Sequence, residues 1–280
     1  MQSSHSSASS GAKRLRLAVL VSGGGTNLQA ILDRSRAKTL DAEVVVVASD
    51  RKDARGLARA REAGVPTHVA SYGGAVGGGG DGPLPVDLDA LDRRQRIIRH
   101  PDRRERLERL ERLVRTEEKL LDLLERFEPD YVCLAGYMRL LSPYFLDRCN
   151  RGDDYRVINI HPALLPSFPG RNGYEDSFGY GCKWGGVTVH FTDEGEDSGP
   201  IIAQAVYPIL PGDDIDGVRR RGLRLEYAVY SQCINWLARG QARLCREPGR
   251  RPRVEITDPA YAAILSNWIE EALPREPAST

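Results

Sequence analysis

The sequence has 280 residues, of which 41% are hydrophobic and 28% charged, the composition of an ordinary globular protein. Its 40 Lys and Arg residues balance 39 Asp and Glu residues, which excludes binding to nucleic acid or acidic membranes through overall charge. No apolar run reaches the roughly 20 residues that cross a bilayer. The polar N-terminal residues lack the apolar core of a secretory signal. We therefore expect a cytoplasmic protein that contacts no membrane.

The five cysteines are widely spaced, odd in number and without a CxxC pair. This pattern favours neither a disulfide framework nor a zinc site. We expect reduced thiols and no bound metal.

Short apolar runs alternate with helical patterns over residues 15–70. Buried strands are expected at 17–21, 42–50 and 65–70, with helices after the first run and at 54–64. Strands that alternate with helices in this way form a parallel α/β sheet. The Ser-rich residues 1–14 that precede them are expected to form a disordered tail.

Residues 73–115 are interpreted as an insertion into a compact α/β unit. Residues 73–85 form a Gly-rich linker. Leucines at helical spacing over 92–127 predict one long amphipathic helix or two in succession. The polar face mixes Arg and Glu, which is typical of a solvated surface with local ion pairs or, alternatively, offers a basic strip for RNA or a protein partner.

The second half of the chain returns to strands. We expect strands at 129–136 and 156–161, with a helical turn over 137–147 between them. Two more strands, at 186–195 and 201–209, form an antiparallel extension, and helices follow at 214–238 and 259–272. The fold class is therefore α/β, with a doubly wound, mostly parallel sheet, an antiparallel edge extension and a helical insertion. The main domain is placed at 15–242 and a C-terminal extension at 243–280.

The segment SGGGTN at 22–27 lies between a buried strand and the start of a helix. Glycines there expose backbone N–H groups, and the helix dipole adds partial positive charge, so the loop suits a phosphate. It is not a Walker loop, and Leu28 at the third glycine position excludes a dinucleotide fingerprint. The alternative is a glycine turn that only packs the strand against the helix.

Asn159 and His161 stand two residues apart at the end of a predicted strand. Period-two alternation puts both side chains on one face, at the carboxyl edge where open α/β sheets bind ligands. An amide can hold a carbonyl oxygen, and an imidazole can donate a proton to it. A purely structural histidine is the competing interpretation.

A third cluster, TDEGEDSGPI at 192–201, is an acidic loop. It is either an exposed turn or the source of one carboxylate aimed into a cleft. In the second case the carboxylate would orient an imidazole, raise its pKa and help to move a proton through water.

Together, SGGGTNLQAILD, PDYVCLAGYMRLLSP, INIHPALLPSFPG and VTVHFTDEGEDSGPIIAQ, in that order, resemble the phosphoribosylglycinamide formyltransferases, the folate-dependent transformylases of purine synthesis. The resemblance covers about 16–72 and 116–238 and implies a formyltransferase-like, Rossmann-type sheet. It implies that Asn159, His161 and Asp197 are catalytic. The other implied contacts are Gly25, Thr26 and Asn27 to the substrate phosphate, Glu226 to the ribose, and Met138, Arg139, Leu140 and Leu141 to the folate. His190 also matches a family histidine, and its role stays open.

The resemblance implies direct attack of the glycinamide amine on the formyl carbon of the co-substrate 10-formyltetrahydrofolate. Asn159 and His161 would stabilise the tetrahedral oxyanion, and Asp197 would accept a proton by way of water. No metal and no covalent enzyme intermediate are required. The expected partners are the two small-molecule substrates, with no nucleic acid, in a monomer or a homodimer.

Several features depart from the family pattern or leave alternatives open. The family arginine that contacts the folate falls at Arg112 or Arg115, and the stretch 171–186 differs from the usual sequence. A formyltetrahydrofolate hydrolase would use the same set of catalytic Asn, His and Asp residues, but we would expect a regulatory domain before its catalytic part. A methionyl-tRNA formyltransferase would need more than residues 245–280 for RNA binding. A non-catalytic binding protein could instead use the helix at 92–127.

Overall fold

The structure is a computed structural model that describes residues 14–72, 82–151 and 154–273. The expected disordered tail, apart from Arg14, and most of the Gly-rich linker lie outside the described residues. One sheet has the strand order β3-β2-β1-β4-β5-β6-β7. Its strands are β1 (Leu15–Val21), β2 (Ala42–Ser49), β3 (Thr67–Val69), β4 (Tyr131–Leu134), β5 (Val157–His161), β6 (Trp184–Phe191) and β7 (Ile201–Pro208).

Neighbouring strands from β3 to β5 pair in parallel, whereas β6 runs antiparallel to β5, and β7 runs antiparallel to β6. This confirms the predicted mostly parallel sheet with an antiparallel extension. The helices are α1 (Thr26–Arg36), α2 (Arg55–Glu62), α3 (Leu88–Arg94), α4 (Arg103–Phe127), α5 (Pro143–Cys149), α6 (Gly173–Tyr180), α7 (Ile215–Ala238) and α8 (Tyr261–Ala272).

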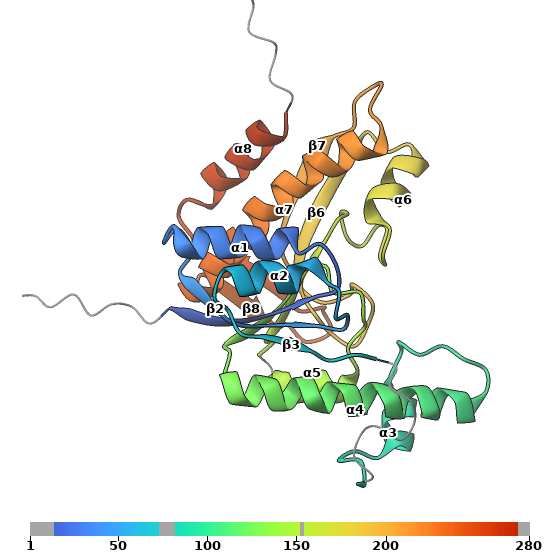
Figure 1. Cartoon of the computed structure of the whole chain (residues 1–280). Coiled ribbons are helices and arrows are strands. Elements are labelled where there is room, and N and C mark those ends of the chain that lie inside the picture. Colours follow the sequence, from blue (N-terminus) through green and yellow to red (C-terminus); the bar gives the residue numbers. More distant parts are fainter. Residues whose placement is uncertain (1–13, 73–81, 152–153, 274–280) are drawn as a thin grey trace, which may run out of the picture.

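The central strand β1 explains the layering of the domain. Its residues point alternately to two cores, Leu17 and Val19 to one and Ala18 and Leu20 to the other. The helices α1, α2, α7 and α8 cover the first face, and α4 and α5 cover the second, as Figure 1 shows. A strand that is buried on both faces must be apolar at every position, which is why its sequence is a continuous hydrophobic run.

Two predicted helices begin elsewhere than expected. The turn predicted over 137–147 becomes helical only at Pro143, because Ser142 caps α5 by accepting from the Phe145 N–H at 3.3 Å. The pattern at 92–127 forms two helices, α3 and α4, with a break at 95–102. Proline at position 101 disfavours helix just before it, and Asp102 caps α4.

The last part of the chain packs onto the main core. Trp268 and Ala272 of α8 are buried in the same cluster as Trp236 of α7, and the Trp236 and Trp268 rings meet edge to face at 5.9 Å. A two-stranded sheet, β8 (Ala242–Cys245) with β9 (Arg253–Ile256), connects α7 to α8. This hairpin and α6 were not predicted.

Candidate functional site

A cleft of about 480 Å³ opens at the carboxyl edge of the sheet, where the strand order reverses around β1 and β4. The loops that follow these strands are joined, because the Ser22 N–H donates to the Gly136 carbonyl at 3.1 Å and the Met138 N–H donates to the Ser22 hydroxyl at 2.8 Å. The cleft is lined by all the residues predicted for the site: Gly25, Thr26, Asn27, Met138, Arg139, Leu140, Leu141, Asn159, His161, Asp197 and Glu226.

The side chains of Asn159 and His161, at the end of β5, converge on Asp197. The amide nitrogen of Asn159 lies 3.4 Å from Oδ1 of Asp197, and Nδ1 of His161 lies 3.3 Å from Oδ2. His190 is the partner of Asn159 on the antiparallel strand β6. Its Nε2 lies 3.2 Å from the Asn159 amide and 3.6 Å from the Asp197 carboxylate. An amide, two imidazoles and one carboxylate therefore form a single cluster.

The loop between β5 and α6 holds both the imidazole and the carboxylate. The Phe168 carbonyl lies 2.8 Å from Nε2 of His161, and the Gly170 N–H donates to Oδ2 of Asp197 at 2.8 Å. Phe168 and Asp197 have φ values of 54° and 49°, a left-handed region that side-chain-bearing residues rarely adopt. Such conformations persist only where the surroundings fix them, and they are frequent at active sites.

Burial and neighbouring charges shift the pKa values of His161 and Asp197 in opposite directions. Burial lowers the pKa of His161, and the Asp197 carboxylate and the Phe168 carbonyl offset this only in part. Burial alone would raise the pKa of Asp197, but the contacts with His190, His161 and the Gly170 N–H outweigh it and hold that pKa below its usual value. The carboxylate therefore stays ionised. The carboxylate raises the pKa of the imidazole, as expected, but burial of the ring outweighs this contribution.

The glycine loop combines packing with exposure. Gly25 has a φ of 68°, and a Cβ there would lie 2.5 Å from the Cα of Gly56, so glycine is required where α1 approaches α2. At Gly23 and Gly24 a Cβ would meet nothing within 4 Å, and both residues line the cleft. Gly25 therefore serves the packing of α1 against α2, while Gly23 and Gly24 expose their backbone beside the first turn of α1.

Glu226 of α7 lies at the wall of the cleft with 5% of its surface exposed. Tyr174 of α6 donates its hydroxyl to one carboxylate oxygen, and the amide of Asn27 donates to the other at 2.5 Å. Burial raises the pKa of Glu226, and these two hydrogen bonds offset the rise only in part. Sequence reasoning missed Tyr174, because its contact depends on how α6 packs against Gly222 of α7.

The segment 138–141 supplies an apolar wall. Met138 and Leu140 are 48% and 38% exposed, and both line the cleft. Between them, Arg139 donates to the buried Asp50 at 2.8 Å and lies 5.1 Å from the centre of the Tyr72 ring. This fixes the backbone of the segment and leaves the apolar side chains facing the cleft.

A buried carboxylate supports the same segment from behind. Glu117 of α4 accepts the N–H of Ser142 at 2.7 Å and also its hydroxyl. Burial raises the pKa of Glu117 to about 8, although both hydrogen bonds oppose the rise. Glu117 therefore anchors the end of the 138–141 wall to the helix α4.

Both candidates for the arginine that contacts the folate lie on α4, and this contact stays a prediction. Neither Arg112 nor Arg115 lines the cleft, and Arg115 pairs with Glu111 on its own helix at 2.9 Å. The arginines that do line the cleft are Arg51, Arg139 and Arg171. Arg139 was among the predicted folate contacts, whereas no local sequence signal distinguishes Arg51 and Arg171 from the many other arginines of the chain.

Other features bear on the ligands that the site could hold. Over residues 14–72, 82–151 and 154–273, no group of three or more His, Cys, Asp or Glu side chains could hold a metal ion. None of the helices that the structure describes is long and apolar enough to cross a bilayer. The five cysteines are free thiols, and burial raises the pKa of the Cys133 thiol to about 12.

An amide, an imidazole and a carboxylate at the carboxyl edge of the sheet suit a protein that transfers formyl groups. Comparison with known proteins identifies the same class. The chain belongs to the formyl transferase family, whose match spans residues 15–234. It is 33% identical to the phosphoribosylglycinamide formyltransferase of Escherichia coli K12 over 249 residues, which is 89% of this chain and 99% of that protein.

Two further relatives extend the comparison. The trifunctional purine biosynthetic protein adenosine-3 of Drosophila melanogaster is 37% identical over 237 residues, 84% of this chain and 15% of that protein. The crystal structure of glycinamide ribonucleotide transformylase 1 from Symbiobacterium toebii superposes with a TM-score of 0.66 at 39% identity. That match covers 88% of this chain and 95% of the other, so the similarity includes nearly the whole of that enzyme.

Proposed function

We infer that this chain transfers the formyl group of 10-formyltetrahydrofolate to the amine of glycinamide ribonucleotide, a step of purine biosynthesis. The observation that carries the inference is the convergence of Asn159, His161 and Asp197 in one cleft with the glycine loop and the apolar wall 138–141. The Escherichia coli and Symbiobacterium toebii relatives are named for formyl transfer to this ribonucleotide.

The glycine loop supports a ribonucleotide at one end of the cleft. The N–H groups of the first turn of α1, with Thr26 and Asn27, have no acceptor within the helix and suit a phosphate. Glu226 is close by, because Asn27 bonds to it directly, and its carboxylate would accept ribose hydroxyls. In this assignment Tyr174 is a positioning residue, which holds the carboxylate of Glu226 from the opposite side.

The apolar side chains of Met138 and Leu140 suit the planar part of a folate. Cofactor pockets usually combine apolar walls with a small number of placed polar groups. The wall borders the same cleft as Asn159, so a formyl group on a folate bound there would come within reach of the amide. The folate would supply the formyl group and leave as tetrahydrofolate.

The chemistry assigned to the cluster conserves atoms and charge. The amine of glycinamide ribonucleotide forms a C–N bond to the formyl carbon, and the resulting oxyanion accepts hydrogen bonds from Asn159 and His161. Collapse breaks the bond to N10 of the folate, and the proton lost by the amine reaches N10 by way of water and Asp197. For His161 to reach the oxyanion through Nε2, the substrate must displace the Phe168 carbonyl that lies there.

A transfer assay with both substrates, beside a reaction without the ribonucleotide, tests the proposal. We expect equal amounts of formylated ribonucleotide and tetrahydrofolate, and little formate when the ribonucleotide is omitted. Release of formate at the same rate with and without the ribonucleotide would favour the hydrolase instead.

A further inference from the structure

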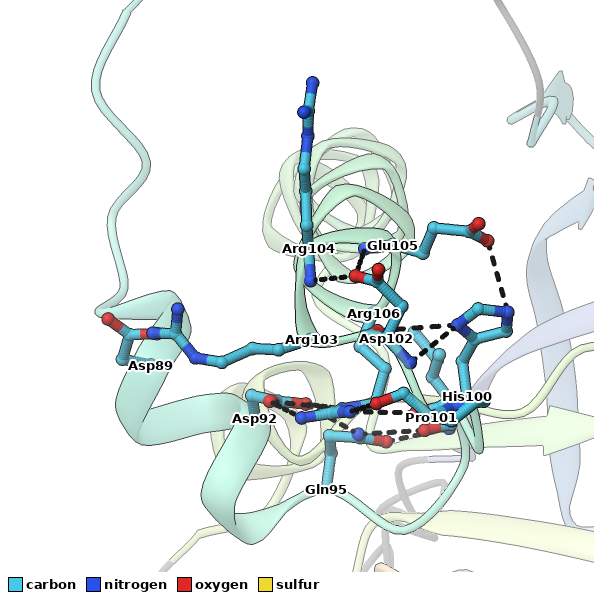
Figure 2. A network of polar contacts seen from close by, with 11 residues as sticks. Asp89, Asp92, Gln95, His100, Pro101, Asp102, Arg103, Arg104, Glu105 and Arg106 are labelled. Atoms are coloured by element: carbon cyan, nitrogen blue, oxygen red, sulfur yellow. Dashed lines mark hydrogen bonds and ion pairs between the residues drawn. The ribbon is translucent and has the colours of Figure 1, made fainter.

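Residues 82–115, here called the α3–α4 segment, are held together by a dense polar network (Figure 2). Arg106 of α4 binds Asp92 of α3 through Nε at 3.1 Å and Nη2 at 3.0 Å, and donates to the His100 carbonyl at 2.8 Å. The side chain of Asp92 is only 9% exposed, and its pairing with Arg106 holds its pKa below the usual value. Buried, bidentate pairs of this kind fix geometry more firmly than exposed ones. The α3–α4 segment is therefore held in a defined conformation by its own side-chain contacts.

The turn after α3 carries one residue into the cleft. Gln95 is buried, and its Oε1 accepts the N–H groups of Ile97 at 3.0 Å and Ile98 at 2.7 Å. Its Nε2 donates to Asp92 at 3.1 Å, which joins the turn to the same network. Ile97 lines the cleft that holds Asn159 and Asp197. The α3–α4 segment thus contributes to the wall of the proposed active site.

Arg94, the last residue of α3, joins the segment to two other elements. It donates through Nη1 and Nη2 to the carboxylate of Asp147 on α5, at 2.6 and 2.8 Å. It also donates through Nε to Oε1 of Glu194 at 2.7 Å. A planar guanidinium that bonds two carboxylates fixes their relative positions, which a single flexible ammonium would not do. Glu194 belongs to the acidic loop 192–200 that carries Asp197.

That acidic loop is also held from its other end. Asp193 accepts the Gly195 N–H at 3.0 Å and the Ser198 hydroxyl at 2.6 Å, which closes the loop on itself. Arg251, in the connection between β8 and β9, donates to the Ser198 carbonyl. Asp197, with its positive φ, lies between the two points at which the loop is held. A residue in this conformation needs support from its surroundings.

We propose that the α3–α4 segment is a working part of the formyl-transfer site, in which Arg94 is a positioning residue that holds Glu194 and thereby sets the loop that presents Asp197 to His161. The proposal rests on the function inferred above. The segment acts on the reaction through the acidic loop, and no contact between Arg94 and the reacting atoms is needed. It assigns a purpose to the helical region that the sequence predicted as an insertion.

Steady-state kinetics of Arg94→Gln, Glu194→Gln and the double variant test the proposal, with Arg109→Gln as the matched control. Arg109 lies on the same segment, pairs with Glu105, and is 47% exposed against 44% for Arg94. We expect Arg94→Gln to lower kcat about fivefold, the upper range for an exposed ion-pair network, with the KM for glycinamide ribonucleotide unchanged. The double variant should be no slower than Arg94→Gln, because both changes break the same contact. The control should match wild type.

Hydrogen exchange of the amides at 192–198 supplies a readout that does not depend on activity. These amides should exchange faster in Arg94→Gln than in wild type, and at the wild-type rate in Arg109→Gln. A wild-type kcat in Arg94→Gln, or an equal loss in Arg109→Gln, overturns the proposal whatever the exchange shows. If the wild-type protein does not formylate the ribonucleotide, the proposed function is wrong. If the amides at 192–198 exchange at the wild-type rate in Arg94→Gln, then Arg94 does not hold the acidic loop, whatever the activity shows.

Discussion

Asp197 and Glu226, two of the carboxylate residues that line the cleft, have pKa values shifted in opposite directions. Asp197 contacts two imidazoles and a backbone N–H, which together hold its pKa below the usual value in spite of burial. Among the residues that the structure describes, the side-chain donors to Glu226 are the neutral groups of Tyr174 and Asn27, and burial raises its pKa. Depth of burial alone therefore does not decide the charge of a carboxylate; the charge available among its partners does.

The opposite pKa shifts of Asp197 and Glu226 suit different functions at the two ends of the cleft. An ionised Asp197 can accept a proton and pair with an imidazolium during transfer. Glu226, whose pKa burial raises, would accept the hydroxyl groups of a ribose beside the phosphate. Pairs of titratable groups whose environments push their pKa values apart are a common device in active sites.

The largest effect is expected at the imidazole next to Asp197. His161→Ala should lower kcat by about 10²–10⁴-fold, because one donor to the oxyanion and the proton path through the ring are lost. The KM for glycinamide ribonucleotide should change little. Circular dichroism should show the wild-type fold, and near-normal turnover in a folded variant would remove His161 from the mechanism.

Glu117, another buried carboxylate, extends the comparison to the pH dependence of the free energy of unfolding. Its pKa rises from 4.5 to about 8 on folding, so the folded state holds the proton more tightly than the unfolded state. Stability from this group is full below about pH 4.5 and is lost as the pH rises toward 8. Urea unfolding at pH 5 and pH 8 should show a loss of a few kcal/mol in wild type that is much smaller in Glu117→Gln. The same pH dependence in both proteins would mean that Glu117 is not the group responsible.

A smaller effect is expected at the other end of the cleft. Tyr174→Phe removes one of the two donors to Glu226, which leaves a carboxylate oxygen unsatisfied in a buried place. We expect the KM for glycinamide ribonucleotide to rise about fivefold to tenfold, with kcat within about twofold of wild type. A fall in kcat without a change in KM would show that Tyr174 serves the chemical step instead.

The smallest effect concerns the imidazole itself. Burial lowers the pKa of His161 and Asp197 partly restores it, so removing the charge in Asp197→Asn should lower the pKa further. An NMR titration of the His161 ring in wild type and in Asp197→Asn can follow this. A higher pKa in Asp197→Asn would contradict the electrostatic account.

Much of the fold and site could be predicted because the signals are local. The run from Leu17 to Val21 must be a central strand, since apolar residues at successive positions need two cores. Asn159 and His161 share a face because side chains on a strand alternate. The acidic loop lies near them because the chain leaves β6 beside β5.

The rest depended on packing between segments that are distant in the sequence. Tyr174 meets Glu226 only because α6 lies across α7, and Ile97 reaches the cleft only because Gln95 shapes the turn after α3. The net direction of the His161 pKa shift depends on the competition between burial and charge, and the sequence identifies the charged neighbour but not the depth of burial. The strands β8 and β9 have only four residues each, too few for the alternation of polar and apolar residues in β9 to stand out.

The central claim is that Asp197 serves the chemical step and Glu226 serves the ribonucleotide, in one formyl-transfer cleft. Steady-state formyl transfer by Asp197→Asn and Glu226→Gln, measured side by side, tests it most directly. The account predicts that Asp197→Asn lowers kcat at least about a hundredfold with little change in KM, and that Glu226→Gln raises the KM for glycinamide ribonucleotide with little change in kcat. The same parameter changing in both variants would contradict it.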